Sequence, residues 1–305
     1  MNTQTLNHTE VTKLQAWILA SRPKTLFASI GPVVLGTSLA YKSYEIFDLS
    51  IFIVTLLCAL LLQVSTNLAN DYLDAKKGID TSERLGPIRV TNSGILSLKE
   101  VQLAFFLTIL VALILGLYLM IVGGWPIILI GLLSIWFSYA YSGGPFPLSH
   151  NGLGEVAAFI FFGPVATMGT HFLQSHVFDL STFIIGSGVG MISVSILAIN
   201  NLRDIATDSK TEKKTLAVRF GEKFQRKLCL FGYFASIILV IIFSLQTKYY
   251  YCAFAILAII PFIATLKYLN KGEINSTLNN HLAMTGKYLF LYCLIISMLI
   301  HIPVA

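Results

Sequence analysis

The sequence has little charge and few residues of the kind that hold transition metals. Charged residues make up 12% of its 305 positions, whereas hydrophobic residues make up 55%. Because a soluble domain normally carries about 25% charged residues, this composition excludes a soluble domain of any size. The four cysteines stand singly and the six histidines form no two-histidine metal motif, so neither a disulfide framework nor a zinc site is expected.

What the sequence has in quantity is apolar runs near 20 residues, each long enough to cross a hydrocarbon core of about 30 Å. We therefore predict an all-α, polytopic membrane protein. A cleavable signal peptide is not expected, since the residues before the first apolar run are mostly polar, and residues 11–20 are typical of an amphipathic interfacial helix. The nine predicted spans are roughly 25–41, 50–73, 100–122, 125–141, 154–174, 179–200, 227–246, 249–269 and 285–304.

The basic residues are distributed unevenly between the two sides of the predicted bundle. With the N-terminus inside, only Lys42 and Lys248 of the 21 Lys and Arg residues fall outside. Because Lys and Arg stay on the cytoplasmic side during insertion, this bias predicts a cytoplasmic N-terminus and supports an odd number of spans. The net charge of +6 thus reflects topology first. The positive residues also concentrate in loops 74–99 and 203–227, which favours an anionic ligand at that face.

Two clusters of amides and carboxylates end two of the predicted spans. In the stretch "NLANDYLDAKKGIDTSERLGPIR", which begins at Asn67, the residues at i, i+3, i+4 and i+7 share one helical face, and Gln63 extends that face one turn deeper. The second stretch, "AINNLRDIATDSKTEKKTLAVRFG", begins at Ala198 and repeats polar residues every four positions. The residues of the two faces are Asn67, Asn70, Asp71 and Asp74, and Asn200, Asp204 and Asp208.

Oxygen ligands of this kind suit Mg²⁺, which commonly binds through one or two carboxylates plus substrate phosphates. Both clusters lie at cytoplasmic helix ends, so their faces are expected to meet across one cavity. Arginine offers bidentate geometry to phosphate oxygens that a metal leaves uncovered. Together these features describe a diphosphate site that opens into a membrane-embedded cavity, as an anionic head on a long apolar tail requires.

Two other interpretations of the acidic clusters remain open on the residues alone. Solvated helix ends with ordinary capping would explain one cluster, but two matched clusters on the same side make it a weaker explanation. A transporter would use intramembrane carboxylates to bind cations or protons, with acids near the bilayer midplane on broken helices. Here the acids stand at helix ends beside Arg and Lys, which favours phosphate.

The stretches "NLANDYLDAKKGID" and "NNLRDIATD" resemble the two aspartate-rich motifs of the UbiA superfamily of intramembrane prenyltransferases. The likeness covers nearly the whole chain. The flanking stretches "RPKTL", "RLGPIRVTNSG", "YSGGPFPLSHNGLGE" and "KKTLAVRFG" are similar to the MenA branch, which prenylates 1,4-dihydroxy-2-naphthoate. The hydroxybenzoate branch usually has an R-T-x-x-R-P type of ending where Arg84 to Arg89 stand here.

The resemblance implies nine helices bundled around a central cavity, and one prenyltransferase domain over residues 1–305 with residues 1–24 as a lead-in. It also implies transfer of a polyprenyl group from its diphosphate to dihydroxynaphthoate, with loss of CO₂ and diphosphate, giving demethylmenaquinone for menaquinone synthesis in the inner membrane. Other acceptors, such as hydroxybenzoate, homogentisate, a chlorin or haem, stay open within the superfamily. The implied partners are the two substrates and membrane lipid, and no nucleic acid.

The site residues implied by the resemblance fall into three groups. Mg²⁺ ions would be held by Asn67, Asp71, Asp74, Asn200, Asp204 and Asp208, of which the four aspartates act in catalysis. Diphosphate or substrate contacts are expected from Asn70, Asp80, Arg84, Arg89, Asn201, Arg203, Lys214 and Arg219. The acceptor carboxylate is expected at Arg22 and Lys24, and aromatic contacts to the ring or the allylic cation at Tyr139 and Tyr141.

Overall fold

The computed structural model describes residues 12–78, 85–87 and 89–303, and over these residues the chain is helical throughout, with no strand. The all-α class is thus confirmed. The α-helices are α1 (Lys13–Ser21), α2 (Pro23–Tyr44), α3 (Leu49–Lys76), α4 (Leu98–Ala140), α5 (Gly154–Ile160), α6 (Ala166–Ser175), α7 (Leu180–Arg203), α8 (Ile205–Asp208), α9 (Leu216–Thr247), α10 (Ile263–Lys271) and α11 (Leu278–Leu299). Three further segments are η1 (Leu148–His150), the π-helical η2 (Phe161–Val165) and the 3₁₀-helical η3 (Tyr250–Phe262).

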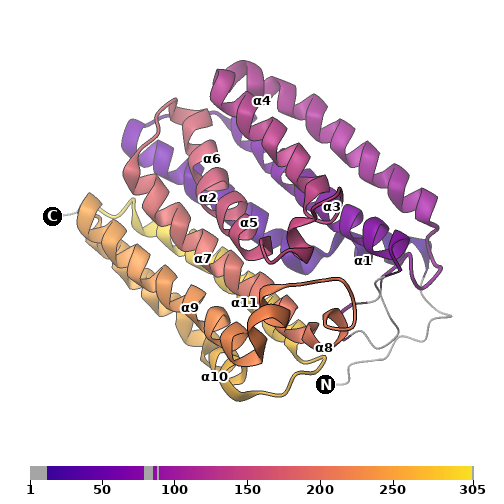
Figure 1. The fold of residues 1–305 in the computed structure, drawn as a ribbon. Helices are drawn as coiled ribbons and strands as arrows, with labels where there is room; N and C mark the ends of the chain where they lie inside the picture. Colours follow the sequence, from indigo (N-terminus) through magenta and orange to yellow (C-terminus); the bar gives the residue numbers. More distant parts are fainter. Residues whose placement is uncertain (1–11, 79–84, 88, 304–305) are drawn as a thin grey trace.

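Helix α4 is two rods joined at a glycine. A straight helix of its 43 residues would be about 65 Å long at 1.5 Å per residue, about twice the thickness of a bilayer core. Gly124 interrupts it with φ 64° and ψ −155°, a conformation that only glycine adopts readily. The two arms run side by side in Figure 1, and they correspond to the predicted spans 100–122 and 125–141.

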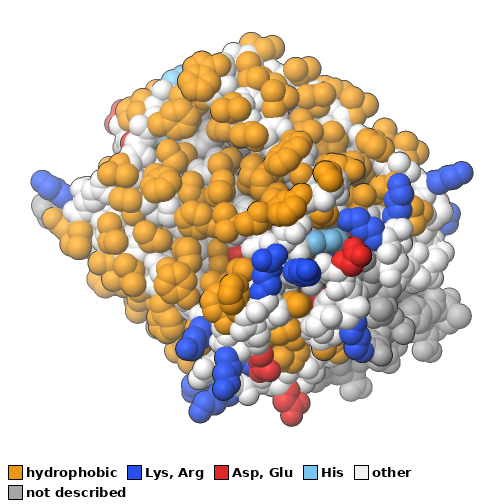
Figure 2. Space-filling view, in the orientation of Figure 1, with side chains coloured by type: hydrophobic (Ala, Val, Ile, Leu, Met, Phe, Trp, Pro, Cys, Tyr) orange, Lys and Arg blue, Asp and Glu red, His pale blue; other side chains and the backbone are white. Residues whose placement is uncertain are grey.

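The described residues contain seven helical segments long and apolar enough to cross a membrane, and α4 is counted once among them. The 22-residue α2 is outside that group and matches the predicted span 25–41. Figure 2 shows hydrophobic side chains over most of the visible face, with Lys and Arg gathered toward one end. Side chains such as Ile121 and Trp125 are more than three-quarters exposed, as lipid-facing groups would be. The chain is a multi-span membrane protein, and the count of nine crossings stays a prediction.

Local sequence signals set where several helices begin. The Thr12 side chain accepts a hydrogen bond from the Gln15 backbone N–H at the start of α1. Asp48 does the same for Ser50 and Ile51 at the start of α3. Such caps satisfy backbone donors that a helix leaves without partners. The predicted interfacial helix at 11–20 therefore appears as α1, over Lys13–Ser21.

Close backbone packing joins η2 to α7. A Cβ added at Gly163 would lie 2.6 Å from the Cα of Gly190, so only glycine allows this approach. Small residues of this kind are how helices pack tightly within membranes. Pro164 falls inside the same segment, whose π-helical turn widens the helix, and such π-bulges are frequent at functional sites. This wall of the bundle borders the cavity described below.

Candidate active site

The first acidic cluster occupies the last turns of α3. Asp71 and Asp74 are buried, with Asp74 only 1% exposed. The Arg89 guanidinium, from the segment that follows α3, donates to Asn70 Oδ1 at 2.8 Å and to Asp74 Oδ2 at 3.1 Å. Thr91 Oγ1 donates to Asp71 Oδ1 at 2.7 Å. The predicted face of α3 is therefore held by side chains of Arg89 and Thr91, from the segment between α3 and α4.

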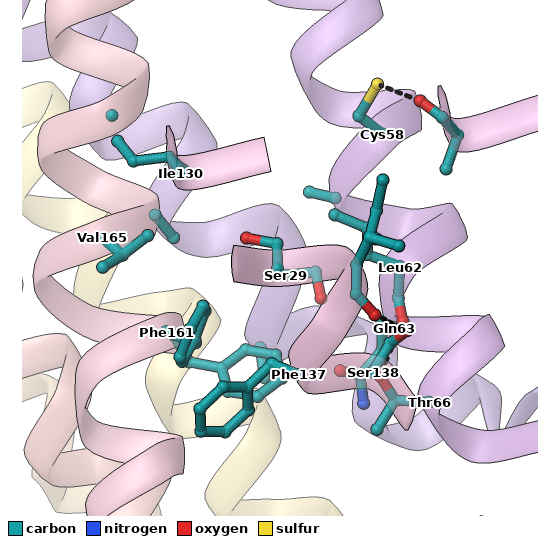
Figure 3. Close-up of a pocket in the computed structure, with 18 of the residues that line it drawn as sticks. Ser29, Cys58, Leu62, Gln63, Thr66, Ile130, Phe137, Ser138, Phe161 and Val165 are labelled. Atoms are coloured by element: carbon teal, nitrogen blue, oxygen red, sulfur yellow. Dashed lines mark hydrogen bonds between the residues drawn. The ribbon is translucent and has the colours of Figure 1, made fainter. Parts of the chain in front are cut away.

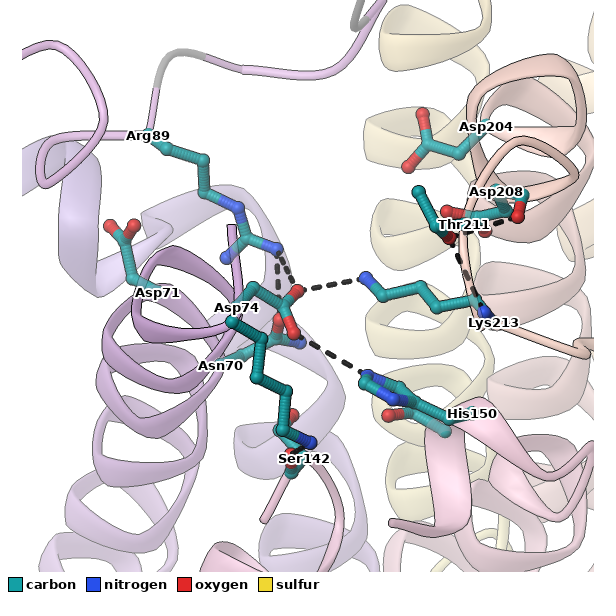
Figure 4. A network of polar contacts seen from close by, with 12 residues as sticks. Asn70, Asp71, Asp74, Arg89, Ser142, His150, Asp204, Asp208, Thr211 and Lys213 are labelled. Atoms are coloured by element: carbon teal, nitrogen blue, oxygen red, sulfur yellow. Dashed lines mark hydrogen bonds and ion pairs between the residues drawn. The ribbon is translucent and has the colours of Figure 1, made fainter. Parts of the chain in front are cut away.

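Two further residues reach Asp74 from distant parts of the sequence. Lys213 Nζ donates to Asp74 Oδ2 at 2.8 Å, and His150 Nε2 lies 3.5 Å from Asp74 Oδ1. Figure 4 shows Lys213 extending toward Asp74 from the side of Asp204 and Asp208. Lys213 thus reaches the first acidic cluster from the chain segment that follows the second.

Sequence reasoning missed both of these residues. It chose Lys214, whose side chain is exposed and whose backbone N–H donates to the His150 carbonyl at 2.8 Å. Periodicity could not choose between the adjacent lysines, because neither lies within a regular helix. His150 stands in the stretch "YSGGPFPLSHNGLGE", which was already singled out, but it was considered only as a metal ligand.

The second acidic cluster does not lie on one continuous helix, as its spacing had predicted. Helix α7 ends at Arg203, and Asp204 has φ −92° and ψ 3°, after which the short α8 runs to Asp208. The Asp208 N–H still donates to the Asp204 carbonyl at 2.8 Å, so the chain turns without separating the two acids. Both side chains are buried.

The side chain of Arg203 bonds to other residues of the protein. Its guanidinium donates to both carboxylate oxygens of Asp204, at 2.7 and 2.6 Å, and to Asn200 Oδ1 at 2.8 Å. A fourth bond, of 2.7 Å, goes to Asn279 Oδ1 at the start of α11. Arg203 is 2% exposed. It was predicted to contact substrate, but the structure places it as the buried partner of the second cluster.

The two clusters face one another across a gap, with Asp71 and Asp74 on one side and Asp204 and Asp208 on the other (Figure 4). Within the described part of the chain, no group of three or more His, Cys, Asp or Glu residues stands close enough to form a metal site by itself. The donor set is nonetheless the oxygen-rich one that suits Mg²⁺. Asp74 Oδ1 is buried and has no hydrogen bond of ordinary length within the described residues, where His150 Nε2 lies 3.5 Å from it. The residues present fit a magnesium ion that a substrate diphosphate helps to hold.

Beside the clusters lies a cavity of about 340 Å³, bordered by α2, α3, α4, α5, η2, α6 and α7. Its polar end is lined by Arg22, Asn67, Asn70, Tyr141 and Asn200. The lining becomes mainly apolar beyond this end, with residues that include Leu119, Ile127, Phe161, Phe162 and Leu173. Part of this lining is drawn in Figure 3. From Asn70 to Thr55 the lining follows α3 for about 22 Å at 1.5 Å per residue. A long apolar group can therefore extend inward from the charged clusters.

The four residues predicted to contact the acceptor separate into two pairs. Arg22 and Tyr141 line the cavity. Lys24 and Tyr139 are exposed and lie outside its lining, because the first turn of α2 and the last turn of α4 direct them outward. Tyr141 follows the last residue of α4 and is half-buried at the polar end of the cavity.

The remaining predicted contacts have varied surroundings. Arg219 is exposed, and its Nε donates to the Lys214 carbonyl at 2.9 Å. Asn201 points away from the clusters, because its amide donates to Glu155 Oε1 at 2.9 Å. Asp80 and Arg84 lie outside the described residues.

Glu155 is a buried acid that sequence reasoning did not select. Its Oε1 accepts hydrogen bonds from Asn201 and, at 3.1 Å, from Gln225 Nε2, so it joins α5, α7 and α9. Gln225 also donates to the Ala198 carbonyl. An ionisable residue inside a predicted span marks a candidate functional position, and that signal was available in the sequence. The network supports the end of α7 that carries the second cluster.

Comparison with known proteins agrees with this geometry. Residues 29–294 match the UbiA prenyltransferase family. The 1,4-dihydroxy-2-naphthoate octaprenyltransferase of Escherichia coli K12 is 34% identical over 247 residues, which cover 78% of this chain and 80% of that protein. The enzyme of the same name from Mycobacterium leprae is 31% identical, with 92% and 94% covered.

A solved structure shares the fold. A UbiA homologue from Archaeoglobus fulgidus, bound to DMAPP and Mg²⁺, superposes with a TM-score of 0.69 at 14% identity, over 94% of this chain and 99% of that one. A sequence identity this low is evidence for a shared fold only. The family match, by contrast, covers most of the sequence and includes both acidic clusters. The chain belongs to the UbiA prenyltransferase family.

Proposed function

We propose that the protein transfers a polyprenyl group from polyprenyl diphosphate to 1,4-dihydroxy-2-naphthoate in menaquinone biosynthesis. The names of the relatives in Escherichia coli and Mycobacterium leprae support this acceptor. The observation that carries the proposal is the pair of facing acidic clusters beside a long, mainly apolar cavity. A diphosphate fits the first feature and a prenyl tail fits the second.

The diphosphate would lie between the two clusters. Asp71, Asp74, Asp204 and Asp208, with Asn67 and Asn200, would hold Mg²⁺, which supplies Lewis-acid stabilisation of the negative charge on the departing diphosphate. Lys213 and Arg89 stand beside Asp74 and would bind phosphate oxygens. Lys214, Arg219 and Arg84 are proposed as outer contacts. Fixed positive groups of this kind favour the state in which charge develops.

Transfer begins as the allylic C–O bond breaks and its electron pair leaves with the diphosphate. The ring of dihydroxynaphthoate then forms the new C–C bond, and the bond to its carboxylate breaks to release CO₂, which returns an electron pair to the ring. Oxidation state is conserved, so the product leaves as the reduced form of demethylmenaquinone. The apolar cavity would exclude water from the allylic cation.

The acceptor would enter at the polar end of the cavity. Arg22 would pair with its carboxylate, and the neutral ring of Tyr141 would face the cation, to which aromatic faces are attracted. Both side chains line the cavity. Lys24 and Tyr139 are not part of this proposal, because the structure keeps them outside the lining.

The cellular setting is also proposed from the chain's own features. The basic residues are concentrated on the side of the acidic clusters, which supports an active site facing the cytoplasm across the inner membrane. Residues 1–305 would act as a single domain.

The decisive experiment is turnover by the purified protein of dihydroxynaphthoate with prenyl diphosphates of several lengths, with and without Mg²⁺. The expected result is a Mg²⁺-dependent product whose mass equals the prenylated, decarboxylated ring, with diphosphate and CO₂ released. A parallel reaction uses 4-hydroxybenzoate. Prenylation of hydroxybenzoate alone would overturn the proposed acceptor, and absence of transfer to either would overturn the proposed function.

A further inference from the structure

Gln63 lies on α3 one turn deeper than Asn67, on the face that carries the first acidic cluster, and it lines the cavity. The two amides nearer the cluster have protein partners. Asn67 Nδ2 donates to the Ser21 carbonyl at 3.0 Å, and Asn70 Oδ1 accepts from Arg89 at 2.8 Å. Figure 3 shows Gln63 near Leu62, Thr66 and Ser138 in the lining of the cavity.

The Gln63 side chain lacks a good partner within the described residues. Its Oε1 is buried and accepts no hydrogen bond there. Its Nε2 has one bond, of 3.5 Å, to Thr25 Oγ1, at the long limit for such bonds. A buried amide oxygen without a donor is costly in an apolar bundle. A ligand that supplies the donor would remove that cost.

Several other hydroxyl groups of the cavity wall bond to their own helices. Ser138 Oγ donates to the Ile135 carbonyl at 2.8 Å, and Thr66 Oγ1 donates to the Leu62 carbonyl at 2.8 Å. Thr55 Oγ1 is also buried and has no partner among the described residues, but it lies eight residues, or about 12 Å along α3, further from the acidic cluster. Gln63 is therefore the better placed of the two to meet a polar group near the reacting carbon.

The chemistry of the substrates indicates which group that is. An amide oxygen needs an O–H or N–H donor, and neither a prenyl tail nor an ionised diphosphate provides one. The acceptor ring carries two hydroxyls in addition to its carboxylate, and each can donate a hydrogen bond. Thr25, the neighbour of Gln63, donates to the Arg22 carbonyl at 2.9 Å, and both Arg22 and Gln63 line the cavity. The cation proposed for the acceptor carboxylate and the amide proposed for a ring hydroxyl thus belong to the same cavity.

We propose that Gln63 Oε1 accepts a hydrogen bond from a ring hydroxyl of the naphthoate acceptor and so selects for hydroxylated rings. This inference rests on the proposed function. A site built to bond a substrate hydroxyl discriminates strongly against the analogue that lacks it, because its own polar atom is then left without a partner. We expect discrimination of about 10- to 100-fold against one of the two monohydroxy analogues.

The test measures inhibition constants of 1-hydroxy-2-naphthoate and 4-hydroxy-2-naphthoate as competitors of dihydroxynaphthoate. The wild-type protein is expected to bind one of them at least about tenfold more weakly than it binds dihydroxynaphthoate. In Gln63→Leu and Gln63→Met that difference disappears and the KM for dihydroxynaphthoate rises, while the KM for prenyl diphosphate is unchanged. Gln63→Glu, which keeps an accepting oxygen, retains the discrimination.

The matched control is Gln174→Leu, at a buried glutamine whose amide is paired with the Asp48 backbone at the opposite end of α3. This variant should keep the wild-type ratio of inhibition constants. Equal binding of both analogues and dihydroxynaphthoate by the wild-type protein, or unchanged discrimination in Gln63→Leu, would overturn the inference. A wild-type protein that does not prenylate dihydroxynaphthoate would overturn the proposed function instead.

Discussion

The two acidic clusters are neutralised by different means. Asp74 is held by Arg89, 15 residues away, and by Lys213, 139 residues away. Asp204 is held by Arg203, the residue immediately before it. The first arrangement exists only in the folded bundle, whereas the second is largely built into one helix end. The first cluster should therefore respond to changes far away in the sequence, and the second to changes beside it.

This contrast bears on how a diphosphate would enter. Lys213 crosses from the side of the second cluster to the first, so its ammonium lies in the gap that the diphosphate would occupy. Arg203 lies behind Asp204, buried against Asn279. Lys213 is thus placed to exchange a carboxylate for phosphate oxygens, while Arg203 is placed to stay with the protein.

Removal of divalent cations should have the largest effect, because both clusters would then lose their proposed link to the diphosphate. Chelation with EDTA is expected to reduce prenyl transfer to background, and added Mg²⁺ is expected to restore it. The measurement is product formation in detergent or proteoliposomes. Full activity after chelation would contradict the metal assignment for both clusters.

Asp71→Asn and Asp204→Asn test whether the two clusters are equivalent in catalysis. Each variant is expected to lose about 10²- to 10³-fold in turnover, since each removes charge that would hold the metal at the developing negative charge. Size-exclusion chromatography should show that both variants still insert and fold. Substantial activity in only one of them would show that a single cluster carries the chemistry.

Arg203→Met tests the second cluster, in which Asp204 is paired with the residue immediately before it. It leaves the buried Asp204 carboxylate without its bidentate partner, which is expected to destabilise the protein by about 3 kcal/mol or more. A thermal unfolding scan in detergent should show a clearly lowered Tm along with lost activity. An unchanged Tm would mean that the second cluster does not depend on this residue.

Lys213→Met tests the first cluster, in which Asp74 is paired with a lysine far away in the sequence. Loss of one charge-assisted contact is expected to lower kcat/KM for prenyl diphosphate by about 10- to 100-fold. The matched variant Lys214→Met, at the exposed neighbouring lysine, should show a smaller loss of kcat/KM. An equal or larger loss at Lys214 would contradict the structural choice between the two lysines.

Glu155→Gln should have the smallest effect. The variant keeps the volume and one accepting oxygen, so the bonds from Asn201 and Gln225 can persist, and activity should fall by less than about tenfold. Measuring both kcat and Tm distinguishes a structural role of Glu155, which would lower the Tm, from a role in the chemistry, which would lower kcat alone. A loss of several hundredfold at unchanged Tm would indicate that Glu155 acts on the substrate.

Some parts of the site could be predicted from sequence periodicity, because they depend only on residues close together along one helix. The spacing of Asn67, Asn70 and Asp74 on one helix face needed only the geometry of an α-helix. The same reasoning was wrong about a continuous helix through Asp204. Helix α7 ends at Arg203 and α8 begins at Ile205, because the backbone of Asp204 leaves the helical conformation between them.

Other parts depended on contacts that no local pattern reports. His150 and Lys213 meet Asp74 only because the loop after α4 and the segment after α8 pack together, where the Lys214 N–H bonds to the His150 carbonyl. Nothing in "KK" distinguishes an inward lysine from an outward one.

The sequence by itself determined that this protein is helical, that it lies in a membrane, and that carboxylates and amides gather at two helix ends. These properties follow from composition and from the period of the helix. Tertiary structure decided which basic residue neutralises which carboxylate, that Arg203 pairs with other protein residues, and that the described part of the chain gives Gln63 Oε1 no donor at the cavity. Those outcomes depend on how separate helices are packed, because hydrogen bonds form between side chains that folding brings within about 3 Å.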